Sequence, residues 1–166
     1  ADKAHLVFHD ADSGFNIFLK LWRQFVKEGK KVTSKSLRQF TQKNFLSFNR
    51  MREWHELHRQ LKNIVDELAF NISPSEATYD QVHRALLSGL LGNIGFKDLE
   101  GQKYAGGRGI KFLIGPRLFR NKGFKWIMAA EIIDTGKLYA QCVAKIDVQW
   151  IESLAKHLLE FDYSNP

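Results

Sequence analysis

Apolar residues in the first half of the chain recur at intervals of three and four, the spacing of helices that bury one face. The clearest stripe is formed by Trp54, Leu57, Leu61, Ile64 and Leu68. It predicts a helix over residues 44–69, with charged residues on the opposite face. Similar spacing predicts three more helices, at about residues 15–28, 34–43 and 78–90. This half of the chain therefore reads as a helical bundle.

The period changes from helical spacing to two-residue alternation at Gly92. Short apolar segments bounded by turn residues then predict five strands, at residues 93–99, 102–105, 109–114, 126–133 and 138–146. A last helix is expected after Asp147, a suitable N-terminal cap. The pattern predicts an α+β multidomain chain, in which an N-terminal helical bundle precedes a small five-stranded OB-fold barrel with a C-terminal helix. We place the domains at residues 1–92 and 93–166.

Positive charge is concentrated in one part of the barrel half. The chain has 25 Lys and Arg against 18 Asp and Glu, a formal net charge of +7. Residues 101–130 hold seven basic residues and no acidic one, so this segment accounts for the whole excess. Aromatic residues and glycines lie between these basic residues, as on surfaces that bind single-stranded nucleic acid. The alternative is a solvated basic face on a hairpin-rich domain.

The basic segment supplies most of the candidate RNA-binding residues. They are Lys103, Tyr104, Arg108, Lys111, Arg117, Phe119, Arg120, Lys122 and Lys125. Basic side chains would contact phosphates, and Tyr104 or Phe119 would stack on a base. Arg50 and Arg52, just before Trp54, are added to the set, although solvated charge on a helix also explains them.

No catalytic or metal-binding constellation is apparent in the sequence. Residues 106–109 (GGRG) lack the Lys-Ser/Thr pair of a phosphate-binding loop, so this chain alone is not expected to hydrolyse ATP. His55 and His58 lie three apart on a predicted helix without an evident third ligand, and no metal or cofactor is expected.

Cys142 is the only cysteine, which suits a reducing compartment such as the cytoplasm. No apolar run approaches the roughly 18 residues of a membrane span.

Several long segments resemble the C-terminal region of DEAH-box RNA helicases. They are residues 87–98 (LSGLLGNIGFKD), 111–119 (KFLIGPRLF) and 125–158. Residues 44–61 (NFLSFNRMREWHELHRQL) resemble the helical helicase-associated domain of the bacterial HrpA type. This resemblance implies a ratchet-like helical domain followed by an OB-fold. It also implies an RNA-binding accessory function, in which the two domains guide single-stranded RNA along a channel formed with RecA-like motor domains.

The same resemblance implies partners outside this sequence. These are the RecA-like motor domains and the winged-helix module of the same protein, and single-stranded RNA or RNA–protein complexes. ATP and Mg²⁺ are implied for the full-length helicase, of which we expect this chain to be a fragment, since it opens without Met. Residues 115–117 (GPR) depart from the His-Pro-Ser turn of many eukaryotic members. An alternative function is a platform that docks a partner or ribosomal protein onto the helicase.

Overall fold

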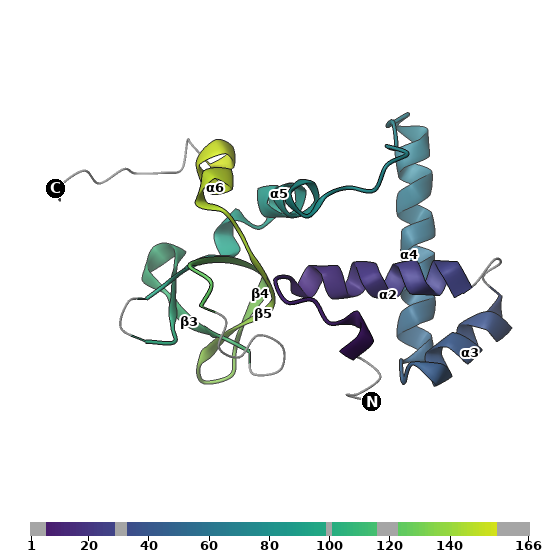
Figure 1. Ribbon diagram of the computed structural model, residues 1–166, viewed down its shortest axis with the longest axis horizontal. Helices are drawn as coiled ribbons and strands as arrows, with labels where there is room; N and C mark the ends of the chain where they lie inside the picture. The colour runs from purple at the N-terminus through teal and green to yellow at the C-terminus, as the bar shows by residue number, and fades with distance from the viewer. Residues whose placement is uncertain (1–5, 29–32, 99–100, 116–122, 156–166) are drawn as a thin grey trace. The chain divides into compact units, whose positions relative to one another are not determined.

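The computed structural model describes residues 6–28, 33–98, 101–115 and 123–155 (Figure 1). Contacts divide the chain into two compact units. The first, called here the helical unit, contains residues 1–9 and 16–76. The second, the barrel unit, contains residues 10–15 and 77–166. The sequence predicted a domain boundary at residue 92. The two contact units are not the same as domains, so they do not test this boundary, which stays a prediction.

The first three helices predicted from the periodicity are present. They are α2 (Gly14–Glu28), α3 (Ser34–Lys43) and α4 (Phe48–Glu67). A short 3-10 helix that was not predicted, η1 (Leu6–Phe8), precedes them. Thr33 and Ser36 form a capping box at the start of α3. The long helix begins four residues later than residue 44, because Ser47 caps it by accepting a hydrogen bond from the Arg50 amide.

Aromatic side chains dominate the core of the helical unit. Its buried residues are Phe8, Leu21, Phe25, Leu37, Phe40 and Met51. Trp22 of α2 and Trp54 of α4 pack beside this core, with ring centroids 5.1 Å apart. Further along α4, however, Leu57, Leu61 and Ile64 are each about half exposed. The stripe predicted the helix correctly but not burial along its whole length.

The five predicted strands form a closed barrel in the barrel unit. They are β1 (Ile94–Lys97), β2 (Tyr104–Gly106), β3 (Lys111–Ile114), β4 (Trp126–Asp134) and β5 (Leu138–Lys145). The strand order around the barrel is β1-β2-β3-β5-β4, and only the β3–β5 pair is parallel. The α+β fold with an OB-like barrel, predicted from the change of period, is confirmed.

Two glycines make room for the Phe112 ring inside the barrel. Gly95 of β1 and Gly106 of β2 are directly paired across the two strands. A Cβ atom on Gly95 would lie 2.5 Å from Cζ of Phe112, and one on Gly106 would lie 2.9 Å from Cε1 of the same ring. Phe112 is 1% exposed and stacks on Tyr104. The barrel interior can therefore hold these two aromatic rings only because the adjacent strand positions lack side chains.

Helices cover part of the outer surface of the barrel. α5 (Tyr79–Gly89), η2 (Leu91–Asn93) and α6 (Val148–Leu154) surround a second apolar cluster. In it, Leu87 of α5 packs with Met128 and Ala144 of the barrel strands, all three fully buried. Thr78 and Gln81 form a capping box at the start of α5, and Asp147 caps α6 as expected.

Candidate nucleic-acid interface

Lysines gather around the carboxyl end of β1. The Lys97 amide donates to the carbonyl oxygen of Lys125 at 2.9 Å, and the Asp98 amide donates to that of Lys103 at 2.9 Å. These two backbone bonds hold Lys125 and Lys103 beside the end of the same strand. Both of their side chains are exposed. We call Lys97, Lys103, Lys111 and Lys125 the β1-end cluster.

Two members of the cluster are positioned by specific contacts. Nζ of Lys111 lies 2.8 Å from an Asp98 carboxylate oxygen, an ion pair in which the lysine side chain is 56% exposed. A pair this exposed contributes at most about 1 kcal/mol, so a phosphate can compete for the lysine. Nζ of Lys125 lies 5.9 Å from the centroid of Phe96, close enough for a cation–π contact. The cluster is thus partly ordered before any ligand arrives.

Arg108 lies in the short turn η3 (Gly107–Gly109), away from the ends of β1 and β2 that carry the lysines. Its backbone is left-handed, with φ 56° and ψ 28°, and its side chain is exposed. A residue with a Cβ atom is uncommon in this region of φ and ψ, and such strain is often found at functional sites. The turn therefore presents the guanidinium group to solvent on a constrained backbone.

The position of Tyr104 contradicts the expectation that its ring stacks on a base. Its ring is 2% exposed inside the barrel, and its hydroxyl donates a hydrogen bond to the carbonyl oxygen of Phe124 at 2.9 Å. Burial also raises the pKa of this hydroxyl. A ring enclosed by the barrel core cannot stack on a base while the barrel is closed. The stacking role predicted for Tyr104 is therefore wrong, and its role is to fill the barrel.

The other candidate residues are divided between two places. Arg117, Phe119, Arg120 and Lys122 lie outside the described residues. Arg50 and Arg52 lie in the first turns of α4, in the helical unit, and both are exposed. The part of the set that the structure brings together is therefore Lys103, Lys111 and Lys125. Lys97, the fourth member of the β1-end cluster, was not among the residues predicted from the sequence.

The structure also brings together a serine and a histidine that the sequence did not single out as a pair. Oγ of Ser13 lies 2.6 Å from Nε2 of His83, and Nδ1 of His83 lies 2.7 Å from the carbonyl oxygen of Tyr79. A carbonyl only accepts, so Nδ1 carries a proton and Nε2 accepts the serine proton. This arrangement resembles a nucleophile with its base, but both residues have 0% exposure. We conclude that the pair joins residues 10–15 to α5 rather than acting on a substrate.

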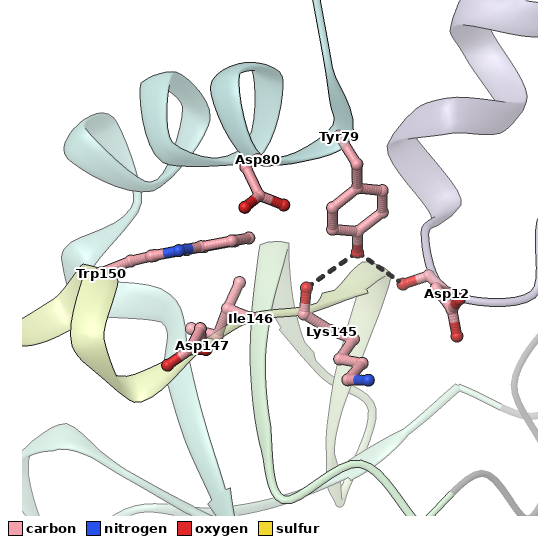
Figure 2. A pocket seen from close by; sticks show the side chains of 7 residues that line it. All are labelled: Asp12, Tyr79, Asp80, Lys145, Ile146, Asp147 and Trp150. Atoms are coloured by element: carbon pink, nitrogen blue, oxygen red, sulfur yellow. Dashed lines mark hydrogen bonds between the residues drawn. The ribbon is translucent and has the colours of Figure 1, made fainter.

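Tyr79 strengthens the same connection at the edge of a pocket. Its hydroxyl lies 3.1 Å from the carbonyl oxygen of Asp12 and 2.8 Å from that of Lys145, as the dashed lines in Figure 2 show. The pocket beside it has a volume of about 330 Å³ and is lined by Asp12, Tyr79, Asp80, Lys145, Ile146, Asp147 and Trp150. Three carboxylates and one lysine make this lining acidic, so it does not suit phosphate.

His55 and His58 pack against the aromatic core of the helical unit. The ring centroid of His58 lies 4.5 Å from that of Trp22, and the centroid of His55 lies 6.2 Å away. Among the described residues, no group of three or more His, Cys, Asp or Glu side chains is arranged to hold a metal ion. None of the helices in the described ranges is long and apolar enough to cross a membrane.

Comparisons with known proteins agree with this fold. No family model matches the chain. It is 42% identical over its whole length to a protein of Haemophilus influenzae named ATP-dependent RNA helicase HrpA homolog, and 38% identical to ATP-dependent RNA helicase HrpA of Escherichia coli. A third relative, ATP-dependent RNA helicase HrpA of Borreliella burgdorferi, is 26% identical over 93% of the chain. The chain spans 13% of the length of each of the first two relatives.

The fold and the charge distribution define an α+β chain with a helical unit and an OB-like barrel that carries a basic end. The whole chain is homologous to a region of the HrpA ATP-dependent RNA helicases, and the resemblance seen in residues 44–61 and 87–98 is confirmed.

Proposed function

We propose that this chain is an RNA-binding accessory module of an ATP-dependent RNA helicase, and that it guides single-stranded RNA along a channel formed with the motor domains. The observation that supports this proposal is the β1-end cluster. Its members Lys97 and Lys103 flank the loop between the first two strands, one of the loops through which OB-fold barrels grip oligonucleotides. The ammonium groups of the cluster, on the exposed Lys103, Lys111 and Lys125 and the partly exposed Lys97, would pair with successive phosphates without reading the base sequence.

The names of the relatives suggest the wider setting of this function. We infer that RecA-like motor domains of the same protein bind and hydrolyse ATP with Mg²⁺, while this chain binds RNA and performs no chemistry. A winged-helix module would be a further partner within that protein. The single cysteine, Cys142, fits a reducing compartment such as the cytoplasm.

Reversal of charge in the β1-end cluster tests the proposal. The double variant Lys103→Glu/Lys125→Glu should bind a fluorescein-labelled single-stranded RNA about tenfold more weakly than the unchanged chain, because two phosphate contacts become repulsive. For the unchanged chain, log K should fall against log[salt] with a slope of about −2 to −3, since about three or four phosphates are neutralised. Fluorescence anisotropy measured at several salt concentrations gives both quantities.

The matched control is Lys27→Glu/Lys62→Glu, which makes the same charge change on exposed positions of α2 and α4 in the helical unit. This control should lose less than about threefold in affinity, because two exposed charges outside the cluster act on RNA only through the screened field of the protein. Equal losses in the two double variants would mean that net charge alone determines binding. A flat salt response would contradict an RNA function and favour a protein-docking module.

A further inference from the structure

Phe45, in the turn between α3 and α4, combines an exposed aromatic ring with a strained backbone conformation. Phe45 has φ 54° and is 64% exposed. The Phe45 amide donates to the Gln42 carbonyl oxygen at 3.3 Å, and the Leu46 amide donates to that of Thr41 at 2.9 Å. These are the two bonds of a Schellman motif, in which the left-handed position is usually glycine. Burial of the ring does not offset the strain, so packing gives no reason for phenylalanine here.

Two guanidinium groups converge on a second ring beside this turn. Cζ of Arg38 lies 4.5 Å from the centroid of Phe48, and Cζ of Arg52 lies 5.9 Å from it. Phe48 itself packs against the buried core of the helical unit, so the ring is a fixed support for both arginines. Within the described ranges, no carboxylate forms an ion pair with Arg38, Arg50 or Arg52. We call Arg38, Phe45, Phe48, Arg50 and Arg52 the α3–α4 corner.

The segment from Thr33 to Arg52, which contains this corner, carries charge of one sign. Residues 33–52 include no acidic residue and five basic ones, Lys35, Arg38, Lys43, Arg50 and Arg52. The amino end of α4 adds the positive end of a helix dipole, and its first turn contains no acidic side chain. Glu53 and Glu56 follow on α4 and line a pocket with Arg52, but neither forms an ion pair with Arg52 within the described ranges. An exposed ring beside unpaired guanidinium groups matches a nucleotide, whose base stacks and whose phosphate accepts hydrogen bonds from arginine.

We propose that the α3–α4 corner is a second RNA contact, separate from the β1-end cluster, in which one base stacks on Phe45 and an adjacent phosphate pairs with Arg38 and Arg52. This inference rests on the proposed RNA function and adds a specific site in the helical unit. It explains why an aromatic residue occupies a position that favours glycine. A protein partner would have to carry several acidic groups around an apolar centre, whereas every nucleotide offers both features.

The variant Phe45→Asn tests the stacking. Asparagine tolerates the left-handed conformation, so the thermal unfolding midpoint should stay equal or rise, while affinity for single-stranded RNA falls about fivefold or more. The double variant Arg38→Gln/Arg52→Gln should also weaken binding by at least about fivefold. The control Lys27→Gln/Lys62→Gln removes the same charge from exposed positions of α2 and α4 and should lose less than about twofold.

Photo-crosslinking of RNA that contains 4-thiouridine separates the two proposals. Crosslinked peptides are expected from the loop around Phe45 as well as from the barrel unit. Crosslinks confined to the barrel unit, or affinity within about twofold of the unchanged chain for Phe45→Asn, would overturn the α3–α4 corner and leave the proposed function intact. Absence of salt-dependent RNA binding by the unchanged chain would overturn both.

Discussion

Replacement of Gly95 by alanine should lower the free energy of unfolding by about 2–3 kcal/mol, because the added methyl group overpacks the barrel core. Its Cβ would lie 2.5 Å from Cζ of Phe112 and 3.0 Å from Cβ of Tyr104. The Phe112 ring cannot easily withdraw, since it is 1% exposed and stacked on Tyr104. Urea unfolding followed by circular dichroism measures the loss.

The control for this substitution is Gly92→Ala. No atom lies within 4 Å of a Cβ built on Gly92, so its stability should change by less than about 0.5 kcal/mol. The double variant Gly95→Ala/Phe112→Leu should recover about 1–2 kcal/mol relative to the sum of the single changes, since leucine removes the ring atoms that the methyl group meets. Additive effects would show that the contact with Phe112 is not the cause.

The pairing of Gly95 with Gly106 could not be predicted from the sequence, whereas the barrel could. Period-two alternation after Gly92 predicted all five strands, because the barrel buries one face of each strand. The interior role of Tyr104 depends on register, and β2 has only three residues to set it. A shift of one residue would point the ring outward, as the predicted stacking role requires, and the sequence alone does not determine the register.

The candidate RNA site could also be predicted only in part. Lys103 and Lys125 were predicted because they lie in a segment without acidic residues, and the structure places both beside the end of β1. The ion pair between Lys111 and Asp98 depends on tertiary pairing of strands, which charge counting does not include. The left-handed φ of Phe45 was also missed, because the motif that imposes it normally carries glycine.

Long-range polar contacts are the least predictable part of this chain. Ser13 and His83 are 70 positions apart in sequence, and each is unremarkable in its own segment. Only the packing of residues 10–15 against α5 makes them neighbours. The structure therefore identifies His83, rather than any residue of the predicted sites, as the polar residue whose loss should destabilise the barrel unit most.

Replacement of His83 by alanine should lower the free energy of unfolding by about 3 kcal/mol near neutral pH, because it leaves a cavity and removes two buried hydrogen bonds. The imidazole ring also stacks on Tyr79, with centroids 3.7 Å apart. The milder variant Ser13→Ala should cost about 1–2 kcal/mol, since it leaves Nε2 of His83 without its donor. Arg84→Ala is the control, an exposed position on the same helix where the change should stay below about 0.5 kcal/mol.

The effect of His83 should also depend on pH in a defined direction. Burial is the largest influence on this imidazole and lowers its pKa in the folded protein, against the opposing effects of the Tyr79 carbonyl, Asp10 and Asp80. The unfolded chain, with a histidine pKa of about 6.5, therefore binds more protons than the folded chain as the pH falls below that value. The stability that neutral His83 contributes is present above about pH 6.5 and decreases as the pH falls toward the folded pKa.

Urea unfolding of the unchanged chain and of His83→Ala at about pH 7.5 and about pH 5.5 measures this linkage, since the variant has no imidazole to titrate at this position. The difference in unfolding free energy between the two proteins should be largest at the higher pH and smaller at the lower one. Other histidines and the carboxylates are common to both proteins, so their titration cancels in the comparison. An equal difference at the two pH values, or a larger one at the lower pH, would mean that His83 is not held neutral by burial.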